Sequence, residues 1–90
     1  MDIKQKEHQF YVGELDKPEA VMKFSVENDV IDINHTLVSE ELRGQGVGEA
    51  LFKEVVEYAR EHDLKLKQDA TCSFGVVMIK RHKKKLEDIL

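Results

Sequence analysis

The chain has 90 residues, of which 41% are hydrophobic and 36% are charged, and its formal net charge is −4. This length suits a single domain over residues 1–90 and leaves little room for a separate substrate lobe. The negative charge argues against general nucleic-acid binding, and no stretch reaches the roughly 18 apolar residues that a membrane span needs. The N-terminus lacks the apolar run of a secretory signal and Cys72 is the only cysteine, so we expect a cytoplasmic location and a free thiol.

Three strands are predicted in the first half of the chain. Alternating apolar and polar residues indicate strands over residues 8–12, about 20–27 and 30–38. A proline-containing turn at residues 16–19 and a hairpin turn at residues 27–29 join them. Short connections of this kind favour antiparallel neighbours.

The third predicted strand carries a candidate site residue. Its alternation places four side chains on one face of the sheet: Ile31, Ile33, His35 and Leu37. The opposite face is expected to carry the remaining three: Asp32, Asn34 and Thr36. A histidine on an apolar face is more often a packed core residue than a catalyst, so both interpretations of His35 stay open.

A helix, a strand and a second helix are predicted in the other half. Residues 39–42 form a turn with Ser39 as the expected N-cap, and from Gly46 or Val47 to about residue 62 the apolar period is helical. Residues 64–69 predict a strand, and a last amphipathic helix is marked by Phe74, Val77, Met78 and Arg81. The order is therefore β-β-β-α-β-α, an α+β fold with a mixed, mostly antiparallel sheet and two main helices, in which the helical crossover makes the last two strands parallel.

A cluster of glycines lies where the third strand gives way to the first helix, in the run Arg43-Gly44-Gln45-Gly46-Val47-Gly48. The start of a helix leaves amides unpaired and carries partial positive charge, so it can bind an anion. Glycines let the backbone approach a phosphate closely, and Arg43 can add a charge-assisted contact. The alternative, a flexible turn, would need only one glycine. The P-loop and Rossmann motifs do not fit, because their lysine and glycine spacings are missing.

This run is similar to the R/Q-x-x-G-x-G/A signature of the GNAT acetyltransferase superfamily. The chain also resembles the small single-domain yjdJ-type branch of that superfamily. Four segments carry this resemblance: His35-Thr36-Leu37-Val38, Glu41-Leu42-Arg43-Gly44-Gln45-Gly46, Cys72-Ser73-Phe74 and Lys80-Arg81-His82. The chain departs from the branch where Ser73 replaces a usual proline and where Lys83-Lys84-Lys85 replaces Pro-Glu-Tyr.

The resemblance implies an N-acetyltransferase that uses acetyl-CoA as cosubstrate and acetylates a small-molecule or protein amine. The backbone of Thr36, Leu37 and Val38 would pair with the pantetheine arm. The pyrophosphate would lie on the loop amides of Arg43, Gly44, Gln45, Gly46, Val47 and Gly48. Phe74 and His82 are further expected cofactor contacts. No metal, nucleic acid or membrane is expected as a partner, and the chain is expected to be a monomer or a weak homodimer.

Cys72 and His35 are the candidate catalytic residues. Because the thiolate is the reactive form, Cys72 would need a pKa lowered by His35, by His82 or by the start of the last helix. A covalent acetyl-cysteine step and a purely structural role for Cys72 both stay open. Glu40 and Glu41 are alternative bases, although acidic residues at the start of a turn are typical of helix capping.

Two other functions stay open. A chain this small offers few residues for an acceptor pocket, so the main alternative is a CoA-binding or acyl-carrying module without transferase activity. The second alternative is an interaction module that binds an acidic partner through the basic run from Lys80 to Lys85. Such a run is also typical of a solvated helix end.

Overall fold

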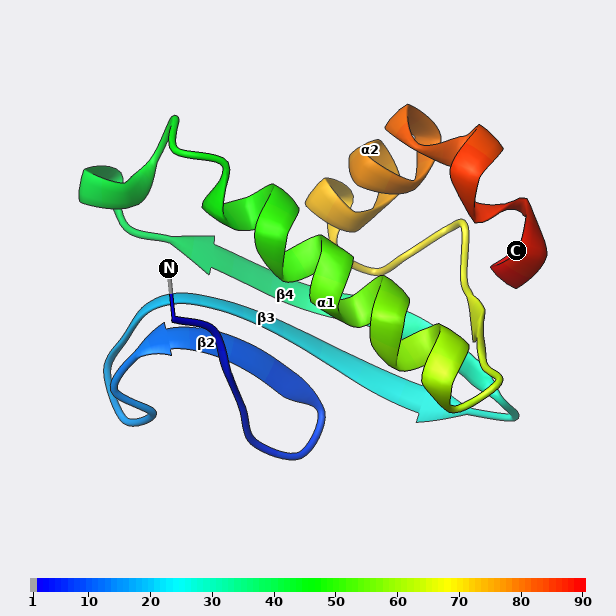
Figure 1. The fold of residues 1–90 in the computed structure, drawn as a ribbon, viewed down its shortest axis with the longest axis horizontal. Helices are drawn as coiled ribbons and strands as arrows, with labels where there is room; N and C mark the ends of the chain where they lie inside the picture. Colours follow the sequence, from blue (N-terminus) through cyan, green and yellow to red (C-terminus); the bar gives the residue numbers. More distant parts are fainter. Residues whose placement is uncertain (1) are drawn as a thin grey trace.

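The structure is a computed structural model, and it describes residues 2–90. Three strands, β2 (Gln9–Gly13), β3 (Pro18–Glu27) and β4 (Val30–Val38), form an antiparallel meander. A two-residue strand stands at each edge: β1 (Lys4–Gln5) is antiparallel to β2, and β5 (Lys65–Leu66) is parallel to β4. Together they form the predicted mixed, mostly antiparallel sheet (Figure 1).

Two α-helices, α1 (Val47–Glu61) and α2 (Ser73–Arg81), lie side by side over this sheet (Figure 1). Tyr58 of α1 packs on Phe24, and Gly75 of α2 approaches Ile33. Phe24 and Ile33 are cross-strand neighbours, so both helices cover the same face. Short 3-10 segments, η1 (Glu40–Leu42) and η2 (Lys83–Ile89), precede α1 and follow α2. The predicted order of strands and helices is confirmed, and β1 and η2 are additions.

The core lies between the sheet and the helices. As predicted, α1 buries one apolar face, which consists of Val47, Leu51, Phe52, Val55, Val56 and Ala59. In α2 the prediction was partly wrong, because Met78 is buried but Val77 is 50% exposed. Within residues 2–90, no helix is both long and apolar enough to cross a membrane.

Ser39 does not act as the predicted cap. Its hydroxyl makes no hydrogen bond to any of the described residues, and its side chain caps no amide of η1. The segment that follows is a single 3-10 turn, which closes through backbone bonds such as the one from the Leu42 amide to the Ser39 carbonyl at 3.0 Å. A helix this short leaves few amides that need a cap.

The predicted strand over residues 64–69 is shorter than expected. Only Lys65 and Leu66 pair with β4. The chain then leaves the sheet and is brought back to β4 at Thr71, whose amide and hydroxyl donate to the Asp32 carboxylate at 2.7 Å and 2.6 Å. It returns to β4 where the Cys72 amide donates to the Ile33 carbonyl at 2.9 Å. Beyond that bond, no strand among residues 2–90 pairs with the outer edge of β4.

A β-bulge interrupts the pairing of β3 with β4. Lys23 pairs with His35, and the next residue, Phe24, pairs with Ile33. Asn34 is therefore an extra residue on β4. An extra residue shifts the alternation of side chains by one position, so the second half of the strand presents the opposite set of side chains to the helices.

The bulge corrects the prediction for His35. Ile33 is buried under the helices, but beyond the bulge Thr36 and Val38 take the inner face. His35 and Leu37 point to the outer face, where both are exposed. The expectation that His35 shares a face with Ile33 was wrong because regular alternation does not allow for an unpaired residue.

Candidate functional site

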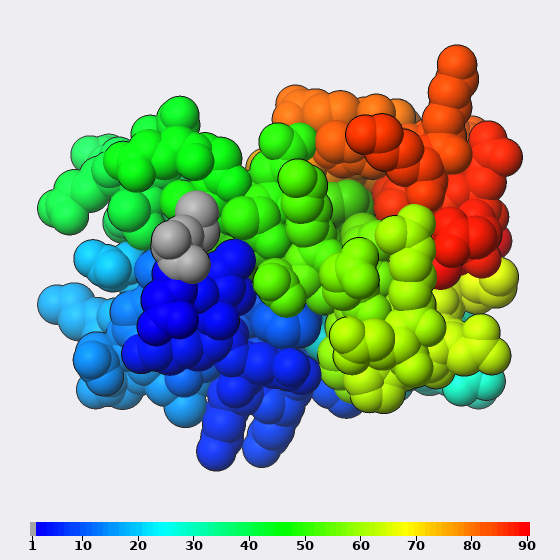
Figure 2. All heavy atoms as spheres, viewed as in Figure 1, coloured from blue at the N-terminus to red at the C-terminus, as the bar shows by residue number. Residues whose placement is uncertain are grey.

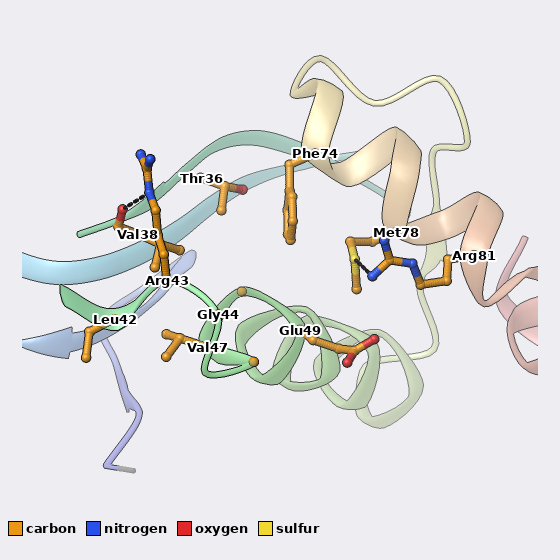
Figure 3. A pocket seen from close by; sticks show the side chains of 12 residues that line it. Thr36, Val38, Leu42, Arg43, Gly44, Val47, Glu49, Phe74, Met78 and Arg81 are labelled. Carbon is orange, nitrogen blue, oxygen red and sulfur yellow. Dashed lines mark hydrogen bonds between the residues drawn. The ribbon is translucent and has the colours of Figure 1, made fainter. Parts of the chain in front are cut away.

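A cleft of about 400 Å³ lies between the start of α1 and the length of α2 (Figure 3). The sequence had indicated eight of its lining residues, which are Thr36, Val38, Arg43, Gly44, Gly46, Val47, Gly48 and Phe74. It is also lined by Leu42, Glu49, Met78 and Arg81. The cleft therefore joins the glycine loop, the second half of β4 and one face of α2.

The glycine loop has the geometry of an anion cradle. Gly44 and Gly46 have φ values of +80° and +75°, a region that side chains other than glycine rarely adopt. A Cβ added at either position would meet no heavy atom within 4 Å, so the backbone borders open space. Gly46 is the N-cap of α1, and it has no side chain to accept hydrogen bonds from the first amides of the helix. These amides can serve a bound anion.

Gly48 has a different role from the other two glycines. Its backbone is helical, and a Cβ added there would stand 2.8 Å from Cζ of Phe74. The missing side chain lets the Phe74 ring lie against the first turn of α1, where the ring forms part of the cleft wall (Figure 3). Gly48 thus sets the distance between the two helices.

Two residues of the loop use their side chains locally. Arg43 Nε donates to the Val38 carbonyl at 3.4 Å, which holds the loop against the end of β4. Gln45 Nε2 donates to the Glu41 carbonyl at 2.9 Å, so this side chain is engaged by η1 and does not line the cleft.

Cys72 does not line the cleft itself but lies beside Thr36, which does. It is the N-cap of α2, as predicted from its place before the helix, and its Sγ is hydrogen-bonded to Thr36 Oγ1 at 3.5 Å. Partial burial raises the pKa of this thiol. The hydrogen bond with Thr36 and the nearby amides of Gly75 and Phe74 outweigh burial, so that the pKa lies below its ordinary value. The environment therefore favours the thiolate.

Asp32 holds the chain in place next to Cys72. Its two hydrogen bonds with Thr71 fix the residue that directly precedes Cys72. Partial burial raises the pKa of Asp32, but the bonds from Thr71 and the charge of Lys67 outweigh it, and the pKa is lowered overall. The ionised carboxylate thus anchors the start of α2 to β4.

His82 lies outside the cleft, in a neighbouring groove of about 430 Å³. Its Nε2 is 2.8 Å from Glu49 Oε1, and its ring stacks on Phe52 with a centroid distance of 6.1 Å. Glu49 lines both the groove and the cleft. His82 therefore joins the end of α2 to α1, and its bond to Glu49 connects it to the cleft.

The structure does not bring every predicted residue together. His35 and Leu37 face away from the cleft, so neither side chain meets Cys72. Two residues that line the cleft, Met78 and Arg81, were not predicted as site residues. Their spacing could have indicated them, because they follow Phe74 at i+4 and i+7 on the face of α2 that borders the cleft. Glu49 was not indicated by the sequence as a site residue, because its partner His82 lies far away along the chain.

Comparison with protein families identifies the group to which this arrangement belongs. The family model described as GCN5-related N-acetyl-transferase matches residues 8–89. The chain therefore belongs to the GCN5-related N-acetyltransferase family, a family of acyltransferases that use acetyl-CoA as cosubstrate. Comparison with curated proteins gave no match.

Solved structures share the fold. A GCN5-like protein from Staphylococcus aureus, solved in solution by NMR, is 43% identical, with 98% of this chain and 85% of that one covered and a TM-score of 0.79. The ribosomal-protein-S18-alanine N-acetyltransferase of Escherichia coli is 18% identical, with 86% and 53% covered and a TM-score of 0.61. The IAA acetyltransferase of Bacillus cereus is 16% identical, with 81% and 51% covered and a TM-score of 0.57. This chain thus spans about half the length of the last two.

Proposed function

We propose that this chain binds acetyl-CoA in the cleft between α1 and α2 and transfers the acetyl group to an amine. The observation that carries the proposal is the continuity of the cleft. It joins a glycine loop and an uncapped helix start to the inner side of β4 at Thr36, whose hydroxyl lies 3.5 Å from the thiol of Cys72, a cysteine whose pKa is lowered. The glycine loop, the edge of β4 and Cys72 follow one another in the same order as the parts of acetyl-CoA that they would meet. These parts are the pyrophosphate, the pantetheine arm and the thioester.

The residues present fit the cofactor at both of its polar regions. The pyrophosphate would accept hydrogen bonds from the amides of residues 44–48, with Arg43 adding positive charge. The amide groups of pantetheine would pair with the edge of β4 over residues 36–38, which carries no neighbouring strand in the described part of the chain. Phe74 would cover the arm from the side of α2.

The transfer itself requires a neutral amine and a proton acceptor. The amine nitrogen attacks the thioester carbonyl, a C–N bond forms, the C–S bond breaks, and CoA leaves as its thiol with a proton from the amine. A second route passes through Cys72. Its thiolate would attack the same carbonyl and release CoA, and the amine would then take the acetyl group from sulfur.

Intact mass spectrometry tests the route through cysteine. The protein is incubated with acetyl-CoA without an amine, and the wild type is compared with Cys72→Ala and Cys72→Ser. The cysteine route predicts that only the wild type gains the mass of one acetyl group. Unmodified wild type, together with amine-dependent release of CoA by Cys72→Ala, would leave direct transfer as the mechanism.

An NMR titration tests the binding site. On addition of CoA, we expect the largest amide shifts at residues 36–38 and 43–48, and no shift at Lys6 in the turn between β1 and β2. Shifts gathered elsewhere would contradict the assignment of the cleft. Replacing Gly46 by alanine should weaken CoA binding, because its φ of +75° is strained for any other residue.

One observation favours the alternative of a CoA-binding or acyl-carrying module. The side chain of His35 faces away from the cleft, and Glu49, the one acid among the described residues that line the cleft, is already paired with His82. Release of CoA thiol in the presence of polyamines or lysine peptides separates the two functions. A transferase releases CoA in proportion to the amine, whereas a module binds CoA and stays inactive with every amine.

A further inference from the structure

A basic hollow of about 570 Å³ adjoins the cleft. It is lined by the run from Lys80 to Lys85 together with Glu87. Arg81 lines both the hollow and the cleft, so the two spaces meet at its side chain. Figure 2 shows the orange and red residues of α2 and η2 gathered at the surface of the molecule, beside the green residues of α1.

The charge of this hollow is not neutralised by the protein. Within residues 2–90, no carboxylate lies within 4.0 Å of a charged nitrogen of Lys80, Arg81 or the three lysines that follow. The acid that lines the cleft near Arg81 is Glu49, and its oxygen is taken up by His82 at 2.8 Å. In a chain with a net charge of −4, such an unpaired basic cluster favours an anionic ligand.

The position of Arg81 relates this hollow to the glycine loop. Phe74 lies against Gly48 at the start of α1, and Arg81 follows Phe74 by seven residues along α2. Seven residues of α-helix span about 10 Å. Among the described residues, the guanidinium makes one weak hydrogen bond, from Nη1 to the Met78 sulfur at 3.7 Å, which leaves its other donors available to a ligand.

We propose that Arg81 and the adjoining lysines bind the 3′-phosphate of the CoA adenosine, so that the protein discriminates CoA from dephospho-CoA. This inference rests on the proposed function. The loop amides would serve the pyrophosphate, and the third phosphate of CoA is carried on the ribose next to it. Arg81, which lines both the cleft and the hollow, would meet this phosphate. A phosphate monoester carries more negative charge than either phosphate of the pyrophosphate. It can also accept two parallel hydrogen bonds from one arginine guanidinium.

Calorimetric titration with CoA and with dephospho-CoA tests the inference. The wild type should bind CoA about tenfold more tightly, as one charge-assisted contact would give. This preference should shrink at high salt, because the hollow is open to solvent. Arg81→Gln should bring the ratio of the two dissociation constants close to one by weakening CoA and leaving dephospho-CoA unchanged, and Arg81→Lys should keep part of the preference. Lys83→Gln combined with Lys84→Gln should lower the ratio to a smaller extent.

Lys6→Gln is the matched control, because it removes one positive charge from an exposed turn next to β1, at the edge of the sheet opposite β5. It should keep the full preference, and amide spectra should show that each variant is folded. Equal affinity of the wild type for both ligands overturns the inference and leaves the proposed function intact. A full preference in Arg81→Gln overturns it as well. If neither ligand binds to the wild type, the proposed function is wrong and the inference falls with it.

Discussion

Replacing Gly48 by alanine would place a methyl group at the closest approach of α1 and α2. The new Cβ would stand 2.8 Å from Cζ of Phe74 and 3.3 Å from its Cε2, inside the 3.5–4.0 Å at which carbon atoms pack best. The atom in the way is the far end of a half-buried ring. We therefore expect Phe74 to turn away from α1, whereas the helix itself stays in place.

Two opposing contributions determine the change in the free energy of unfolding. Alanine is more favourable than glycine inside a helix by about 1 kcal/mol. Forcing the Phe74 ring off its preferred rotamer costs about 0.5–1.5 kcal/mol. Gly48→Ala alone should therefore change the stability by less than about 1 kcal/mol, because the two contributions nearly cancel. In a Phe74→Ala background the clash is gone, and the same substitution should stabilise the protein.

Urea unfolding of the four proteins in this double-mutant cycle measures the interaction directly. We expect a coupling energy of about 0.5–1.5 kcal/mol between Gly48→Ala and Phe74→Ala. Gly46→Ala is the matched control, since it destabilises through its positive φ but has open space around its Cβ, and it should show no coupling. A coupling energy of zero at Gly48 would refute the idea that this glycine sets the spacing of the helices.

Two further predictions concern the support of Cys72. Thr36→Val removes a hydrogen bond that lowers the pKa of the Cys72 thiol, so alkylation of Cys72 by iodoacetamide at neutral pH should slow by about threefold. Thr36→Ser should restore the rate. An unchanged rate in the valine variant would contradict this role of Thr36. Asp32→Asn should lower the free energy of unfolding at neutral pH by about 1 kcal/mol through weaker bonds to Thr71. Because the folded pKa of Asp32 lies below 3.8, its contribution is complete above that value and is lost as the pH falls through the folded pKa. Urea titrations should therefore converge in acid, and a constant gap would count against the anchor.

Local patterns were sufficient for most of the fold. The helical period after Gly46 predicted α1 to within two residues, because an apolar face of that length has few alternatives. The bounds of β4 were also predicted. The length of β5 was not, because the path of the chain after it depends on a partner far away in the sequence: Asp32 of β4 binds the chain through Thr71 instead of through further strand pairing. Only the folded chain brings these two residues together.

The candidate site was predictable where it depends on backbone and less so where it depends on side-chain direction. The glycine loop and the place of Cys72 before a helix follow from sequence order. The face of the sheet on which the His35 side chain lies does not follow from sequence order, because it depends on one unpaired residue, Asn34, in the pairing of β4 with β3. Arg81 had the right spacing on α2, but only the meeting of the cleft with the basic hollow points to a ligand for it.

The bulge at Asn34 determines which side chains of β4 border the cleft. In an unbroken ladder, an imidazole and a leucine side chain would face α2, and the cleft wall would be bulky and ionisable. With one residue inserted, the wall is made of a small hydroxyl at Thr36 and an aliphatic group at Val38. The width and the chemistry of the cleft thus depend on how many residues the strand contains, as well as on which residues they are.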